Sequence, residues 1–123
     1  MIINKKKIKL FNTYYNIQVG TYDNNRLSIH LVNKNEKHNI TLNLKDEYIE
    51  DGRVFLDPLI KDNGVLKELI KLKIIREVCS VINYNYVDIP IATFNIGVLR
   101  KYDPEGVEKH FQIRSNNRSY NEA

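Results

Sequence analysis

The sequence predicts an α+β fold in which an antiparallel sheet of five to six strands, beginning with an N-terminal meander, is packed by one main helix. Three observations carry this prediction. Apolar and polar residues alternate through Arg26–Leu44, helical spacing follows over Val65–Ile70, and two β-rich segments come after it. A sheet that is polar on one face must bury the other, and the predicted helix is the available cover.

The stretch Arg26–Leu44 reads as a hairpin because successive side chains of a strand point to opposite faces. Apolar residues occupy every second position in both halves: Leu27, Ile29 and Leu31 in the first, and Ile40, Leu42 and Leu44 in the second. The polar residues 33–37 between them are typical of a connecting loop.

Two earlier segments show the same alternation. Lys5–Phe11 and Tyr14–Val19 are predicted strands, joined by a turn at Asn12-Thr13. Turn-forming residues 20–25 then lead into the hairpin. The first 45 residues are therefore predicted to form a four-stranded antiparallel meander.

The main helix is predicted to begin at Asp62 or Asn63, because either side chain can accept from free backbone N–H groups at a helix start. It is expected to end near Leu72 or Lys73. Before it, an acidic loop precedes the short extended piece Arg53–Leu56, which we expect to reach the core.

After the helix, Val78–Tyr86 and Ile91–Val98 are predicted strands. A possible short C-terminal helix covers Tyr102–Phe111, starting at Asp103 with Pro104 in its first position. We expect a single α+β domain over residues 1–111 and a polar, disordered tail over residues 112–123.

Size and composition are those of an ordinary globular chain of 123 residues. A single cysteine cannot form an internal disulfide, and the apolar start Met1–Ile3 is too short for a signal peptide. No apolar run approaches the roughly 20 residues that span a bilayer. We therefore expect a cytoplasmic protein with no membrane contact.

The net charge of +4 is unevenly distributed. Residues 1–45 carry eight basic and two acidic side chains, whereas residues 46–63 carry two basic and six acidic ones. The N-terminal strands can therefore attract an anionic partner.

No catalytic, metal or cofactor motif is present. His30 and His38 stand on adjacent predicted strands, on a similar side, but a metal site needs three or four converging ligands. Cys79 lies in an apolar setting without a nearby base and is expected to be a buried, inert thiol. The acidic residues 46–51 lack calcium-loop spacing. We expect no enzymatic activity and no cofactor, and a small enzyme would require distant groups such as His30, His38 and a carboxylate to converge.

Basic and aromatic residues near the N-terminus favour a binding function. Lysines neutralise phosphates, tyrosines stack on unpaired bases, and tyrosines are also enriched at protein interfaces. The side chains expected to contact a partner or nucleic acid are Lys5, Lys6, Lys7, Lys9, Tyr14, Tyr22, Arg26 and His30.

The order of three short motifs resembles a family of small uncharacterised domains from phages and plasmids of low-GC Gram-positive bacteria. The motifs are TYDNNRLSIHL at Thr21–Leu31, DGRVFLD at Asp51–Asp57 and YVDIP at Tyr86–Pro90, with the small helix between the last two. The likeness spans about residues 8–98. It supplies no catalytic residues.

The resemblance implies a protein that modulates host machinery. Our leading expectation is a non-enzymatic binding protein, encoded by a phage or plasmid, that inhibits a bacterial defence complex by surface occlusion, in particular an anti-CRISPR protein. Its partner would be a defence protein or its guide-RNA complex. The alternative is a nucleic-acid-binding accessory protein of the mobile element.

Overall fold

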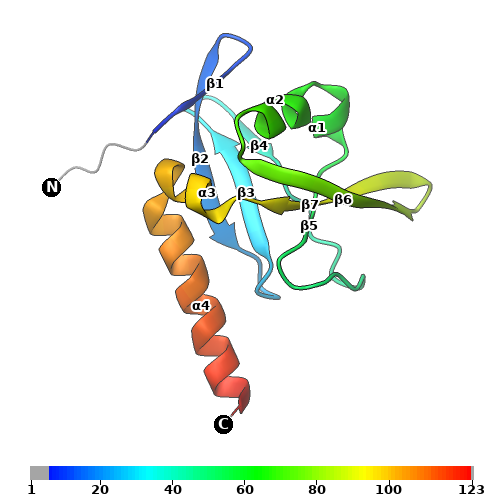
Figure 1. Cartoon of the computed structure of the whole chain (residues 1–123), viewed down its shortest axis with the longest axis vertical. Helices are drawn as coiled ribbons and strands as arrows, with labels where there is room; N and C mark the ends of the chain where they lie inside the picture. The colour runs from blue at the N-terminus through cyan, green and yellow to red at the C-terminus, as the bar shows by residue number, and fades with distance from the viewer. Residues whose placement is uncertain (1–5, 123) are drawn as a thin grey trace, which may run out of the picture.

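The structure, a computed structural model, describes residues 6–122, with side chains through residue 116. It has an α+β fold in which two antiparallel sheets, of four and three strands, combine with four helices in this part of the chain (Figure 1). The elements in chain order are β1 (Ile8–Leu10), β2 (Thr13–Thr21), β3 (Leu27–Val32), β4 (Lys37–Asn39), β5 (Val54–Phe55), α1 (Leu59–Asp62), α2 (Val65–Lys71), β6 (Ile75–Tyr84), β7 (Val87–Phe94), α3 (Ile96–Tyr102) and α4 (Pro104–Glu122).

The predicted N-terminal meander is present as the sheet β1-β2-β3-β4, but its fourth strand lies at Lys37–Asn39, before the predicted one, which contained Ile40, Leu42 and Leu44. Its alternation separates two faces as expected, because residues directly opposite each other share a face. Val19 pairs with Ile29 on the buried inner face, and Lys9 pairs with Tyr14 on the outer face.

The prediction of one sheet of five to six strands is wrong, and the reason lies at Ile40. β4 ends before this residue, whose N–H donates to the Ile29 carbonyl oxygen at 3.0 Å. Two residues later the N–H of Leu42 donates to the Phe55 carbonyl oxygen at 2.9 Å. The chain therefore leaves the meander here and runs along the second sheet.

The second sheet has the strand order β5-β7-β6. Both predicted strands of the C-terminal half are present, but each starts three or four residues earlier than expected. They are joined by a turn at Asn85 and Tyr86, both with positive φ (51° and 69°), as two-residue hairpin turns of type I′ require.

The predicted main helix is present as α2, which begins at Val65, slightly later than expected. A short helix that was not predicted, α1, precedes it, and Gly64, with φ +83°, separates the two. Asn63 nevertheless does what the sequence suggested, since its side chain accepts a hydrogen bond from the N–H of Val65 at 3.0 Å. The buried residues Ile60 and Leu69 fix the two short helices to the main core.

Helix α3 replaces the end of a predicted strand. Asn95 caps it by accepting the N–H of Val98 at 3.1 Å, so β7 ends at Phe94 instead of continuing to Val98. No helix in the described part of the chain is long and apolar enough to cross a membrane.

Helix α4 begins as predicted, with Pro104 after Asp103, but it is not short. It continues to Glu122, although a disordered tail is predicted from Gln112. Its first turns lie beside β2, and its C-terminal half extends past the body of the protein (Figure 1). Burial of Val107 and His110 ties its first turns to the body of the protein. An ion pair between Arg114 and Asp51 extends these contacts beyond Phe111.

The buried apolar side chains form two clusters. The larger contains residues of both sheets and of all four helices, including Ile29, Leu56 and Val107. The smaller one lies between the second sheet and the segment of residues 42–49, which covers Phe55 and Ile91.

Candidate functional site

The turn between β1 and β2 exposes an aromatic side chain in a strained backbone conformation. Phe11 and Asn12 both have positive φ (50° and 67°). Asn and Gly adopt this conformation readily, whereas a bulky residue does so at a cost of about 1 kcal/mol or more. Phe11 is nonetheless 64% exposed. The turn thus holds an apolar ring in solvent at an energetic cost.

Gly64 positions this ring. A Cβ atom built on Gly64 would lie 3.2 Å from Cζ of Phe11, so the tip of the ring rests against the α1–α2 junction. Leu59, at the start of α1, is 67% exposed. Two apolar side chains from different elements therefore stand at one end of the molecule.

Between them lies a hollow of about 340 Å³, which we call the turn hollow. Phe11 and Leu59 line it together with Tyr15 of β2. Its inner wall is apolar and is formed by Leu10, Leu31, Ile40, Ile60 and Val65. Exposed apolar side chains beside such a hollow are typical of surfaces that bind another molecule.

A polar network lines one side of the turn hollow. The Tyr15 hydroxyl donates to Oε2 of Glu36 at 2.8 Å, and Nε2 of His38 lies 3.3 Å from the same oxygen. The hydrogen bond to Glu36 raises the pKa of Tyr15, and the bond from Tyr15 lowers the pKa of Glu36. Glu36 therefore stays ionised at neutral pH and orients both rings.

Family models, curated proteins and solved structures give no match to this chain.

Of the residues expected to bind, the structure brings together Lys9 and Tyr14. They face each other on the outer face of the meander, with the Lys9 ammonium 5.5 Å from the Tyr14 ring centroid. Tyr14 is 58% exposed. Lys7 is exposed next to β1, and Lys6 lies over the Tyr102 ring instead. Lys5 lies outside the described residues.

The remaining candidates have internal partners. The Tyr22 hydroxyl is 2.8 Å from Oγ1 of Thr41. Arg26 donates to the carbonyl oxygens of Leu44 and Glu47, both at 2.7 Å. His30 is half-buried, and burial lowers its pKa, with the charge of Lys37 acting in the same direction.

Two expectations about reactive groups need correction. His30 and His38 lie on opposite faces of the meander, because His38 pairs with the inward-facing Leu31, whereas His30 pairs with the outward-facing Gln18. Cys79 is half-buried, not buried, because β6 is an edge strand whose residues after Ile75 are all exposed or half-buried. Within residues 6–122, no three His, Cys, Asp or Glu side chains are grouped to hold a metal ion.

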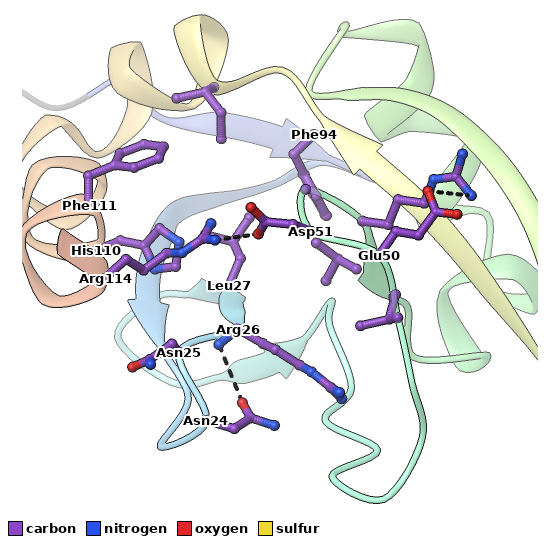
Figure 2. Close-up of a pocket in the computed structure, with 15 residues that line it drawn as sticks. Asn24, Asn25, Arg26, Leu27, Glu50, Asp51, Phe94, His110, Phe111 and Arg114 are labelled. Carbon is purple, nitrogen blue, oxygen red and sulfur yellow. Dashed lines mark hydrogen bonds and ion pairs between the residues drawn. The ribbon is translucent and has the colours of Figure 1, made fainter. Parts of the chain in front are cut away.

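A second cavity, also of about 340 Å³, lies between α4, the β2–β3 turn and residues 49–54; we call it the α4 cavity (Figure 2). Arg114 of α4 reaches Asp51 across it. His110 lies in its wall, buried, with Nδ1 2.6 Å from Oγ1 of Thr21. Burial lowers the pKa of His110, and the positive charge of Arg114 lowers it further.

Sequence reasoning missed Phe11, Leu59 and the residues of α4. The predicted first strand includes Phe11, because the predicted turn at Asn12-Thr13 lies one residue later than the observed turn. No sequence signal marks the turn at Phe11-Asn12, because Phe is not a turn-forming residue. The structure shows the turn by pairing Leu10 with Thr13 across these two residues.

Proposed function

We propose that this protein is a non-catalytic binding protein that contacts a protein partner through the turn hollow and its two exposed apolar residues, Phe11 and Leu59. The observation that carries the proposal is Phe11, an exposed ring held in a strained turn beside an apolar hollow. Aromatic side chains at the centre of an interface supply a large share of its binding energy.

The shape of the site suits one apolar side chain of the partner. Such a side chain would enter the turn hollow, while Phe11 and Leu59 pack around it and exclude water. The rim of the hollow carries no charge of one sign, because Asp57 lines it, His38 is paired with Glu36, and Lys37 stands opposite Val32 on the outer face of the meander. We therefore propose that neutral polar groups surround the partner's apolar side chain.

The partner we propose is a bacterial defence complex, bound in the cytoplasm of the host. On this proposal the protein acts as an anti-CRISPR protein, covering a surface of the effector protein or of its guide-RNA complex. Support for this part comes from the sequence resemblance to domains carried by phages and plasmids.

Substitution of Phe11 by Asn tests the site. We expect F11N to reduce partner binding at least about tenfold, the equivalent of about 1.4 kcal/mol, because it removes an aromatic contact. Asn tolerates positive φ, so the unfolding midpoint should not fall. The measurement is capture of the tagged protein's partner from lysate of a low-GC Gram-positive host after nuclease treatment, with identification by mass spectrometry.

Tyr86→Asn is the matched control. Tyr86 is 98% exposed and also stands at positive φ in a two-residue hairpin turn, but it is not among the residues of the turn hollow. Y86N should capture the partner as the wild type does. Loss of capture in Y86N with retention in F11N would overturn the proposed site.

A second candidate function, nucleic-acid binding, is favoured by the outer face of the meander. Lys9 and Tyr14 are neighbours there, and Lys37 points to the same face opposite Val32. An exposed tyrosine beside lysines suits a single strand, which such side chains bind through stacking and phosphate contacts.

The triple variant Lys7, Lys9 and Lys37→Ala tests this alternative. If the outer face binds single-stranded nucleic acid, the variant should bind more weakly and with a flatter dependence on salt, because fewer counterions are released. The measurement is fluorescence anisotropy with a labelled oligonucleotide at several salt concentrations. Lys61, Lys67 and Lys71→Ala removes the same charge elsewhere. Equal salt slopes for both triple variants would exclude the outer face.

A further inference from the structure

The α4 cavity is not part of the proposed partner surface, and its chemistry is different. Its volume of about 340 Å³ is within the range of small-molecule sites. Leu27, Val54, Phe94, Ile96 and Phe111 give it apolar walls. Charged side chains from three separate segments of the chain also line it, among them Arg114 and Asp51 (Figure 2).

The two partners of the ion pair between Arg114 and Asp51 differ in solvent exposure. The Arg114 side chain is 25% exposed, whereas that of Asp51 is 72% exposed. Asp51 stands in a turn with Gly52, whose φ is +86° and whose surroundings are open. If Asp51 moved away, its carboxylate would return to water at little cost, whereas Arg114 would keep a half-buried charge without an anion.

The other two arginines that line the cavity are less suited to bind an anion inside it. Arg26 donates to two backbone carbonyl oxygens and lies over the Phe55 ring. Arg53 is exposed, with its guanidinium 3.6 Å from the Glu50 carboxylate. Arg114 is thus the cation best placed to bind an anion inside the cavity.

We propose that the α4 cavity binds a small carboxylic acid that carries an apolar ring. The ligand carboxylate takes the place of the Asp51 carboxylate on the Arg114 guanidinium, a planar group that pairs well with carboxylates. The ring lies against Phe94, Phe111 and the aliphatic walls. Asp51 is then an internal competitor that occupies the anion position while the cavity is empty of ligand.

Phenylacetate is the probe for this site, and isothermal titration calorimetry is the measurement. A ligand of this size should bind wild type with a Kd on the order of 1 mM. Asp51→Asn removes the competing charge and should tighten binding about five- to tenfold. Arg114→Gln removes the anion-binding group and should weaken binding at least about tenfold. Phenylacetamide, which has the ring but no charge, should bind more weakly than phenylacetate to the wild type.

Asp23→Asn is the matched control, because Asp23 also has a 72% exposed side chain in an ion pair, with Lys45, and is not among the residues of the cavity. D23N should bind phenylacetate as the wild type does. The tightening in D51N tests the proposal even if R114Q loosens α4. Equal affinities for wild type, D51N and D23N, or phenylacetamide binding as well as phenylacetate, would overturn the assignment. None of these results depends on the partner surface at Phe11.

Discussion

Gly106 lies where α4 meets the backbone of β2, and the absence of a side chain sets the distance between them. A Cβ atom on Gly106 would lie 2.6 Å from the Val19 carbonyl oxygen. Beside it, Asp103 accepts the N–H of Val19 at 2.9 Å and that of Gly106 at 3.2 Å. One carboxylate therefore caps α4 and also satisfies the free edge of β2.

Gly106→Ala should lower the free energy of unfolding by about 1–3 kcal/mol, because the added methyl group displaces β2 or the capping carboxylate. Alanine is a better helix former than glycine, so helix propensity alone would make G106A more stable. A loss of stability would therefore show that the close approach to β2 dominates. Gly97→Ala is the control, since its Cβ would only reach Oδ1 of Asn95 at 3.5 Å. G97A should be neutral or up to about 1 kcal/mol more stable in urea denaturation. A G106A variant as stable as G97A would contradict this account.

The candidate site shows how far single residues can be predicted. Alternation placed Lys9 and Tyr14 on the outer face, where the structure has them. It gave no reason to select Phe11, because an exposed ring in a turn breaks the local preference for Asn or Gly. Arg26 was a reasonable binding candidate by charge, but its hydrogen bonds to two backbone carbonyl groups could not be predicted without the path of residues 44–47.

At the scale of elements, the sequence identified most strands and the pairing of the first three, but not the division of the strands into two sheets. The apolar residues Ile40, Leu42 and Leu44 alternate as a strand of the meander would, yet the last two pack with the second sheet. An alternating pattern reports that one side is buried, and it does not report which sheet buries it. The single predicted sheet was wrong for this reason.

The start of α4 was more predictable than its end. Asp103 and Pro104 marked the start of α4 correctly, because a cap acts through local geometry. Beyond Phe111, α4 contacts the rest of the chain through Arg114, which meets Asp51, 63 residues earlier in the chain. A polar segment with such a distant partner looks disordered when only its own composition is considered.

On the scale of the whole molecule, α4 is the element that links the meander to the segment before β5. Its His110 ring meets Thr21 of β2, and Arg114 meets Asp51. Arg26, Arg53 and Glu50 also line the α4 cavity beside them. The stability of the fold should therefore respond to the protonation of His110.

The direction of this response follows from burial. Burial lowers the pKa of His110 in the folded state, and Arg114 lowers it further. The unfolded chain then binds a proton more readily, so the stabilising contribution is complete above the ordinary histidine pKa of about 6.5 and is lost as pH falls below it. His30, whose pKa burial also lowers, contributes in the same direction.

We expect the free energy of unfolding, measured by urea denaturation, to fall between about pH 7.5 and about pH 5.5 by up to about 1.4 kcal/mol for each unit by which burial lowers a histidine pKa. His110→Gln should lose less stability over this range, since glutamine can still bond to Thr21 but does not titrate. A further reduction is expected when His30→Gln is added. Lys109→Gln removes a charge from an exposed position of α4 and should keep the full pH dependence of the wild type. If H110Q and K109Q lost equal stability with falling pH, the proton would be binding at another group. The contact of α4 with the meander would then not be the acid-sensitive part of the fold.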